Sequence, residues 1–231
     1  MNIIVVGGTS GLGKDIVESL SQEHEVLPMS RRTGFDVRFR RFLPDCDGIV
    51  FSLRYRGDVP QEQFDTEIFG PARVVEGMNS RCRSIVFIST VAAQTVTFDQ
   101  PWAYHASKAA LEQMVRYFAV KLGGVRVNAV APSSVKRDSL NYADFNKFLP
   151  RHLPLKRMIT SKDVVTVVRM LLDPDCPLTG QVLTVDGGMS LLNAESLLRI
   201  VHQKDKEQDQ AMTNNHQRYL SEMEPYDAAQ R

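Results

Sequence analysis

The sequence predicts an α/β domain in which a parallel sheet is covered by helices on both faces. Strand-like apolar runs alternate with helical patterns through the first 190 residues. Two of these runs are IIVV at residues 3–6 and SIVFI at residues 84–88. Neither has the polar–apolar alternation of a strand with one solvent-exposed face. Strands buried on both faces and separated by helices are typical of parallel sheets.

The order of elements follows from the hydrophobic periodicity. We expect strands at residues 2–6, 26–29, 48–53, 84–89, 125–131 and 181–185, with a short extended segment at 35–37. We expect helices at residues 14–22, 61–79, 103–122 and 160–172. The long third helix is followed by Gly123-Gly124, and Thr160 with Asp163 forms a capping-box-like start for the fourth. The stretch from 37 to 48 is short, so one covering helix is expected to be reduced.

The chain divides at about residue 190. Residues 1–190 carry the alternating pattern, and residues 191–231 read as an appendage without a core of its own. Within it, 193–201 is expected to form a short helix, and the polar stretch 202–215 to be solvated or mobile.

Composition excludes several functional classes. The chain has 231 residues, 43% apolar and 24% charged, with a net charge of +1, which gives no reason to expect nucleic acid as a partner. No apolar run reaches the roughly 18 residues of a membrane span. The strand at 2–6 leaves no room for a signal peptide. Cys46, Cys82 and Cys176 lack CxxC spacing and the five histidines are dispersed, so we expect no metal site and a reducing, cytoplasmic location.

A glycine-rich turn joins the first strand to the first helix. Glycines at 7, 8, 11 and 13 permit unusual backbone angles and the close approach of a pyrophosphate, whose charge a helix N-terminus favours. The alternative is a purely structural turn. Its place after an N-terminal strand favours dinucleotide binding. After the second strand, Ser30-Arg31-Arg32 stands where an acidic residue would hold a ribose 2′-hydroxyl. Guanidinium groups suit a 2′-phosphate, which favours NADP over NAD, although a solvated turn is the alternative.

A tyrosine and a lysine lie four residues apart in the sequence YHASK. On a helix this spacing puts Tyr104 and Lys108 on one face. A fixed positive charge favours the phenolate, so the pair is a candidate proton donor to a carbonyl oxygen. Tyr117 and Lys121 repeat the spacing, but they lie roughly 140° further round the same helix. Only one pair can face a cofactor, and we expect Tyr117 to be a packed core or rim residue.

These motifs together resemble the short-chain dehydrogenase/reductase family. The glycine loop resembles its TGxxxGxG and YHASK its YxxxK. VNAVAP at 127–132 resembles its strand before the nicotinamide turn, and GQVLTVDGG at 180–188 its C-terminal signature. The resemblance covers roughly residues 1–190. It implies a single doubly wound (Rossmann-type) sheet and nicotinamide-dependent interconversion of carbonyls and alcohols, in a homodimer or homotetramer.

The resemblance also assigns roles. Tyr104 is implied as the acid/base, Lys108 as its partner, and Thr90, with Ser89 beside it, as the hydroxyl that orients the carbonyl oxygen; the alternative is that both hydroxyls merely end a strand. The residues expected to bind the cofactor are Gly7, Ser10, Gly11, Leu12, Gly13, Ser30, Arg31, Arg32, Asp36, Lys108, Pro132 and Val135.

Three departures from the family pattern mark a divergent member. Its NNAG stretch is Phe51-Ser52-Leu53-Arg54 here, and the glycine after the nicotinamide-turn proline is Ser133. Glu67 aligns with the asparagine that supports the catalytic lysine through water. A carboxylate there could hold that water or pair with Lys108, and pairing would weaken the lysine's effect on Tyr104.

The substrate is poorly specified. Residues 136–157 align with the family's substrate lid and are basic and aromatic, which suits an anionic substrate or, equally, a solvated face. We expect a small carbonyl or alcohol compound. The alternative from another class is an inactive NADP-binding regulator or structural subunit, which the altered positions favour and the retained Tyr104 and Lys108 disfavour. Sugar epimerisation would need a longer substrate domain.

Overall fold

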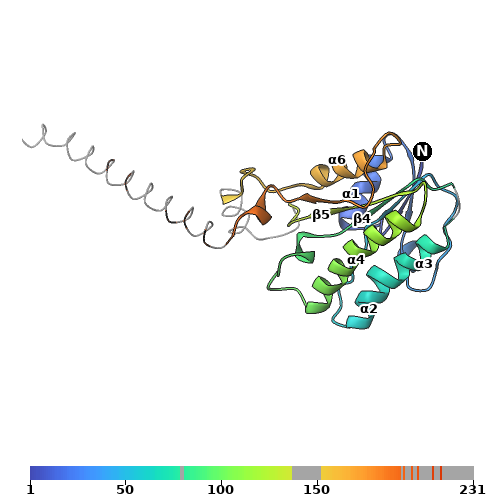
Figure 1. The fold of residues 1–231 in the computed structure, drawn as a ribbon, viewed down its shortest axis with the longest axis horizontal. Helices are drawn as coiled ribbons and strands as arrows, with labels where there is room; N and C mark the ends of the chain where they lie inside the picture. Colours follow the sequence, from blue (N-terminus) through green and yellow to red (C-terminus); the bar gives the residue numbers. More distant parts are fainter. Residues whose placement is uncertain are drawn as a thin grey trace, which may run out of the picture.

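Six parallel strands form one sheet in the order β2-β1-β3-β4-β5-β6 (Figure 1). The structure is a computed structural model that describes residues 1–78, 81–136 and 152–193, together with single positions at 195, 199, 202, 210 and 214. The strands are β1 (Asn2–Val6), β2 (Glu25–Met29), β3 (Gly48–Phe51), β4 (Ser84–Ile88), β5 (Arg126–Pro132) and β6 (Val182–Val185). Each expected strand of the sheet is confirmed, whereas residues 35–37 form none.

The strand order reverses direction between β1 and β3. The chain steps outward from β1 to β2 and then crosses back to pair β3 with the other side of β1, with Val6 opposite both Met29 and Phe51. In an open parallel sheet, the loops that leave the carboxyl ends of strands on the two sides of such a switch point separate and leave a crevice for a ligand. The predicted doubly wound sheet is therefore confirmed, and it places the glycine loop at the switch point.

Helices cover both faces, as predicted. On one face lie α1 (Gly11–Leu20) and α6 (Ser161–Leu172); on the other lie α2 (Pro60–Phe64), α3 (Gly70–Glu76) and α4 (Trp102–Lys121) (Figure 1). Strand residues alternate between the two resulting cores: Val50 packs with α1 and α6, whereas its neighbours Ile49 and Phe51 pack with α3 and α4. This double burial explains the uninterrupted apolar runs in the sequence.

The connection from β2 to β3 has little regular structure. Among residues 30–47 the structure has one short 3-10 turn, Arg31–Thr33, and no α-helix. Phe35 and Val37 leave this connection to pack into the core beneath α3 and α4, with 5% and 4% of their surface exposed. The reduced cover predicted for this segment is present, and two apolar side chains take over part of the sealing.

The helix expected at 61–79 is divided. A π-helical turn, Asp65–Phe69, separates α2 from α3, and the Gly70 N–H donates to the Asp65 carbonyl five residues back. Pro71 supplies the physical reason, because it has no N–H to donate to the Glu67 carbonyl and so the regular ladder cannot continue. Regular helix ends at Glu76 rather than at residue 79, which lies outside the described residues.

The capping box expected at the start of α6 is present. At the start of α6 the Asp163 carboxylate accepts the Thr160 N–H at 2.7 Å, as a capping box requires. Most of the expected substrate lid (137–151) and most of the tail beyond 193 lie outside the described residues. Within the described part, no helix is long and apolar enough to cross a membrane, and no group of three or more candidate ligands for a metal ion occurs.

Candidate active site

The predicted site residues gather at the carboxyl edge of the sheet. All six strands run parallel, so the loops after them emerge at the same edge. The glycine loop follows β1 and Ser30 follows β2, while Arg54 lies beyond β3 and Thr90 beyond β4. Tyr104 lies near the start of α4, which contacts the 3-10 turn Val91–Ala93 that follows β4. The sheet topology thus brings residues from distant parts of the sequence to one crevice.

The glycine loop is tightly built against the rest of the crevice. A Cβ atom at Gly7 would lie 2.2 Å from the Ser52 carbonyl oxygen, and one at Gly13 would lie 2.2 Å from the Gly7 carbonyl oxygen. Gly7 also has φ +88° and Gly11 φ +54°. Side chains at these positions would clash with backbone or strain it, so the close turn from β1 into α1 depends on glycine.

The N-terminus of α1 fits a phosphate group. Ser10 occupies the cap position, its side chain makes no capping hydrogen bond within the described residues, and no acidic residue lies in the first turn. The first N–H groups of a helix have no partner inside it and carry a partial positive charge. Ser10 and Gly11 are exposed at this end, whereas Leu12 turns inward to the core. This arrangement suits a pyrophosphate and leaves Leu12 with a packing role.

The end of β2 is tied to the glycine loop. The Thr9 hydroxyl donates to the Ser30 Oγ at 2.8 Å, and the same oxygen accepts the Arg32 N–H at 3.1 Å. Ser30 thereby caps the turn that carries Arg31 and Arg32, both exposed. The two arginines therefore lie on a rigid turn next to the loop that would hold the pyrophosphate.

Asp36 is committed to a neighbouring arginine. The Arg38 guanidinium donates to its carboxylate at 2.8 and 3.1 Å, and the Arg38 N–H adds a third bond at 3.0 Å. These hydrogen bonds from Arg38 hold the pKa of Asp36 below its usual range. Asp36, expected to bind the cofactor, is therefore a partner of Arg38, which balances its charge.

Tyr104 is nearly buried in the first turn of α4. Only 8% of its surface is exposed. The guanidinium carbon of Arg54 lies 5.1 Å from the centre of its ring, and Arg54 is held there by a 2.8 Å hydrogen bond to the Gln100 side-chain oxygen. A cation over the face of an aromatic ring is attracted to its π-electrons. The positive charge of Arg54, expected near the cofactor, is thus in contact with the ring of Tyr104, the candidate acid.

Lys108 is enclosed by three acceptors. Its ammonium lies 3.0 Å from the Glu67 carboxylate, 3.1 Å from the Leu53 carbonyl oxygen and 3.2 Å from the Ile88 carbonyl oxygen. An ammonium has three N–H donors, so these partners account for all of them. The lysine side chain is 4% exposed and that of Glu67 is 0% exposed. Of the two roles considered for Glu67, the structure has the direct ion pair.

Glu67 is held by more than the lysine. One carboxylate oxygen accepts the Tyr55 N–H at 2.9 Å, and the other accepts the Ser107 hydroxyl at 3.3 Å. The Ser107 oxygen in turn accepts from the Gln63 amide at 3.1 Å. A buried carboxylate is stable when its oxygens are all occupied in this way. The π-helical turn positions Glu67 for these contacts.

Three successive residues after β3 each contact a member of this site. The Leu53 carbonyl accepts from Lys108, the Arg54 guanidinium covers Tyr104, and the Tyr55 N–H donates to Glu67. Leu53 and Arg54, from the segment that replaces the family's NNAG stretch, therefore hold the lysine and the tyrosine, and the next residue, Tyr55, holds the glutamate. Two departures from the family pattern, this segment and Glu67, are therefore in contact with each other or with Lys108.

The two strand-end hydroxyls are placed differently. Ser89 is 4% exposed and its hydroxyl donates to the Glu112 carboxylate at 3.0 Å. Thr90 is partly exposed, and its oxygen accepts the Ala92 N–H at 3.3 Å. Ser89 is therefore occupied in the interior between β4 and α4, whereas Thr90 retains a hydroxyl hydrogen to donate. The geometry ranks Thr90 ahead of Ser89.

The second tyrosine–lysine pair lies elsewhere. Tyr117 is 56% exposed, so it is neither a core residue nor part of the crevice lined by Tyr104.

On the other side of the site, Pro132 ends β5 opposite Val185, and Val135 bridges to Ile159. The Ser133 N–H donates to the Val185 carbonyl oxygen at 3.1 Å, so the residue that stands where the family has glycine is bonded to the end of β6.

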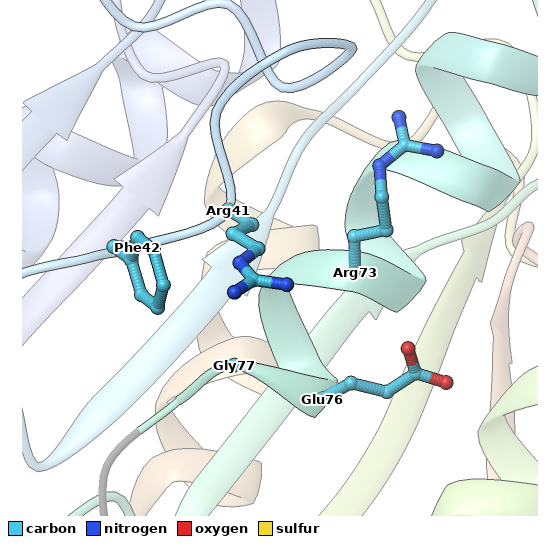
Figure 2. A pocket seen from close by; sticks show the side chains of 5 residues that line it. All are labelled: Arg41, Phe42, Arg73, Glu76 and Gly77. Atoms are coloured by element: carbon cyan, nitrogen blue, oxygen red, sulfur yellow. The ribbon is translucent and has the colours of Figure 1, made fainter.

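Two pockets of the described residues lie away from this crevice. One, of about 160 Å³, is lined by Arg41 and Phe42 from the β2–β3 connection and by three residues of the α3 end. Figure 2 shows Arg73 and Glu76 extending from α3 in different directions around it. The other, of about 240 Å³, lies beside the amino ends of β1 and β2. Neither borders Tyr104, so the chemistry of the side chains identifies the site rather than a cavity.

Two buried polar residues of the site were missed in the sequence. Glu112 binds Ser89 and accepts a second bond from Gln94, and Gln63 supports Ser107. Spacing could have indicated both, because Glu112 lies four residues after Lys108 and Gln63 four before Glu67 on helical segments. The network joining them depends on contacts between α4, β4 and the π-helical turn, which spacing alone does not reveal.

Comparison with known proteins places this geometry in context. A family model described as Enoyl-(Acyl carrier protein) reductase matches residues 61–190. L-xylulose reductase of Caenorhabditis elegans is 40% identical in an alignment 239 positions long. That alignment covers 81% of this chain and 95% of that protein. A tropinone reductase homolog of Arabidopsis thaliana is 37% identical over 114 residues; there the alignment covers 46% of this chain and 44% of that relative.

Solved structures share the fold over most of their length. A small-chain dehydrogenase is 26% identical with a TM-score of 0.68, covering 83% of this chain and 99% of the other. The ligand-free aldohexose dehydrogenase of Thermoplasma acidophilum, 20% identical, has a TM-score of 0.69 and covers 84% of this chain and 95% of its own. The second likeness, at this low identity, shows the fold alone.

Proposed function

The chain belongs to the short-chain dehydrogenase/reductase family of NAD(P)-dependent oxidoreductases, and from this premise we propose that it reduces a ketone or aldehyde with NADPH, or runs the reverse reaction. One observation carries the proposal. Tyr104, nearly buried at the start of α4, shares the carboxyl edge of the sheet with an uncapped helix N-terminus that suits a pyrophosphate. A proton donor and a dinucleotide site thus face one crevice.

The glycine loop, Ser10 and the Ser30–Arg32 turn are the residues that would hold the cofactor, which supplies a hydride when bound. Gly7 and Gly13 allow the backbone to approach it closely, and Ser10, at the N-cap position, leaves the first N–H groups of α1 available to the diphosphate. Arg31 and Arg32 favour NADPH because guanidinium groups bind a 2′-phosphate with charge-assisted hydrogen bonds. Pro132, the last residue of β5, and Val135, three residues later, would contact the nicotinamide end.

Tyr104 donates the proton that the carbonyl oxygen needs as the alcohol forms. Thr90, with a hydroxyl hydrogen to spare, orients that oxygen and stabilises the charge that develops on it. In this chain Lys108 is paired with Glu67, so its charge is compensated. Arg54 lies over the tyrosine ring and places a second positive charge beside the candidate acid.

A second function rests on the Glu67–Lys108 pair. If the lysine must contact the nicotinamide ribose, its three occupied donors would weaken catalysis, and the chain would bind NADP(H) as a regulator without turnover. The two functions separate in one experiment, in which NADPH binding and NADPH oxidation are measured across a panel of ketones and aldehydes. Turnover on any compound supports the reductase, whereas tight binding without turnover on all of them supports the regulator.

The substrate is a small carbonyl compound or its alcohol, and we expect a homodimer or homotetramer. Exposed apolar side chains on the helical face agree with assembly there: Val120 is 88% exposed, Tyr117 56% and Phe69 47%. Residues 1–190 form the catalytic domain in this proposal, and residues 191–231 an appendage. Sizing the full chain against a truncation at residue 190 tests whether the appendage contributes to assembly.

A further inference from the structure

Two cysteines lie side by side at the amino edge of the sheet, opposite the crevice. Cys46 precedes β3 by two residues and Cys82 precedes β4 by two residues. They are 2% and 1% exposed, and both belong to the core beneath α3 and α4. Both thiols are free, and neither takes part in the chemistry proposed above.

The strand register places these cysteines opposite each other. Gly48 pairs with Ser84 at the start of the β3–β4 ladder, and the Arg83 N–H donates to the Asp47 carbonyl at 2.9 Å, so the pairing extends one residue further back. The next residue in each chain segment is a cysteine. Neighbouring strands lie about 4.8 Å apart, which falls inside the Cα–Cα range of about 4.4–6.8 Å found in disulfides.

The thiols interact directly. A hydrogen bond with Cys82, together with burial, raises the pKa of Cys46. The same hydrogen bond lowers the pKa of Cys82. These opposite directions make Cys82 the better nucleophile of the two. The Cys82 thiol also donates a hydrogen bond of 3.6 Å to the Ser84 carbonyl oxygen. Such a pair combines an activated thiol with a resolving thiol in contact with it.

A pocket at the protein surface reaches Cys46, the member of the pair that a small oxidant would meet first. Cys46 lines the pocket of about 240 Å³ at the amino ends of β1 and β2, beside Pro44 and Asp45. A water molecule occupies about 30 Å³ of liquid, so this pocket admits water and a molecule of the size of hydrogen peroxide. The third cysteine, Cys176, belongs to the core on the other face of the sheet and provides an internal comparison.

We propose that Cys46 and Cys82 form a reversible disulfide when the protein meets a small hydroperoxide. One thiol is oxidised to a sulfenic acid as the peroxide O–O bond breaks and water leaves. The second thiol then attacks that sulfur, the S–S bond forms and a second water leaves. Two thiols and one hydrogen peroxide thus give one disulfide and two waters, and a dithiol reductant reverses the change.

The disulfide is expected to act on stability rather than on the crevice. It would close the chain segment that contains β3, the π-helical turn and α3, and so restrict the unfolded chain. For a loop of a few tens of residues this corresponds to a rise in Tm of about 5–10 °C. NADPH binding should not change, because the disulfide lies at the opposite edge of the sheet from the glycine loop.

The experiment treats the full-length reduced protein with hydrogen peroxide at neutral pH, then blocks remaining thiols and maps peptides without reduction. We expect a Cys46–Cys82 linked peptide, the loss of two hydrogen masses, a higher Tm, and complete reversal by dithiothreitol. C176S should behave like the parent protein, and C46S should lose the linked peptide and the rise in Tm. Mapping the unsubstituted chain keeps the test valid even if C46S folds poorly.

Three outcomes would overturn the inference. They are a pair that stays reduced while Cys176 is oxidised, sulfinic or sulfonic acid on either residue without a linked peptide, and a link that involves Cys176. None of these readouts depends on turnover. The inference therefore stands or falls separately from the proposed reductase activity.

Discussion

The Glu67 carboxylate lies 3.0 Å from the Lys108 ammonium, with 0% and 4% of the two side chains exposed. In this chain the lysine four residues after the candidate catalytic tyrosine is therefore half of a buried ion pair. Burial of two charges costs several kcal/mol each, and here the Tyr55 N–H and two backbone carbonyls complete the compensation. The pair is accordingly a unit whose members should not be changed singly.

Replacement of either charge alone should destabilise the protein. Glu67→Gln leaves a buried ammonium and Lys108→Met a buried carboxylate, and we expect each to reduce the free energy of unfolding by about 3–5 kcal/mol. The double variant should lose much less than the sum, because no charge is left without its partner. Urea unfolding measures all three. Additive losses would mean that the two groups do not interact.

Arg54 should matter for turnover and its neighbour Arg56 should not. Arg54→Gln removes the cation 5.1 Å from the Tyr104 ring, a contact of roughly 0.5–2 kcal/mol, so we expect kcat/KM to fall roughly 2- to 30-fold with NADPH affinity kept. Arg56→Gln is the matched control, since that side chain is exposed on the same segment. Equal effects of both variants would assign the loss to general charge rather than to Arg54.

Arg31 and Arg32 should select the cofactor. The double replacement by alanine removes charge-assisted hydrogen bonds of about 1.5–3 kcal/mol, so the preference for NADPH over NADH in kcat/KM should fall roughly 10- to 100-fold. Activity with NADH should change little. Arg116→Ala, on the exposed surface of α4, is the control for loss of a surface arginine away from the crevice. If the preference for NADPH over NADH did not change, the two arginines would belong to a solvated turn that does not bind the cofactor.

Acid should loosen the start of α6. Hydrogen bonds from the Arg157 guanidinium hold the pKa of Asp163 well below its usual range, with bonds from Thr160 adding to the effect. A lowered folded-state pKa stabilises the protein above the unfolded value of about 3.9, and the contribution is lost as pH falls below about 4. Asp163→Asn should lower stability by about 1 kcal/mol at neutral pH and flatten this acid loss.

Thermal unfolding between pH 7 and pH 3 measures this effect. Asp99→Asn, in an exposed loop, should follow the parent protein at every pH. If the Asp163 variant kept the full acid sensitivity of the parent, another carboxylate would have to account for it.

Much of the fold could be predicted because its determinants are local or periodic. The runs around Ile4, Val50 and Val86 show burial on both faces, and glycine positions mark the turn into α1. The π-helical turn was not predicted, although Pro71 within the helical pattern is the residue that forces it.

The sequence could predict which residues of the site would lie at the carboxyl edge of the sheet, but not all of the contacts between them. Spacing indicated the Tyr104–Lys108 face, and the alignment raised pairing with Glu67 as one of two roles. The choice between the two roles depends on burial and on two carbonyl acceptors, Leu53 after β3 and Ile88 in β4, and the spacing of residues in the sequence does not predict these contacts. The same holds for Arg54, whose position over the ring is fixed by Gln100, 46 residues away in sequence.

The central claim, that Tyr104 is the proton donor in a nicotinamide-dependent reaction, is tested most directly by Tyr104→Phe. NADPH binding and NADPH oxidation are measured with the best carbonyl substrate of the panel, beside Tyr117→Phe as the matched control. The account predicts that Tyr104→Phe binds NADPH normally and loses at least about a hundredfold in turnover, as expected for general acid catalysis, while Tyr117→Phe keeps its rate. Undiminished turnover in Tyr104→Phe would contradict it.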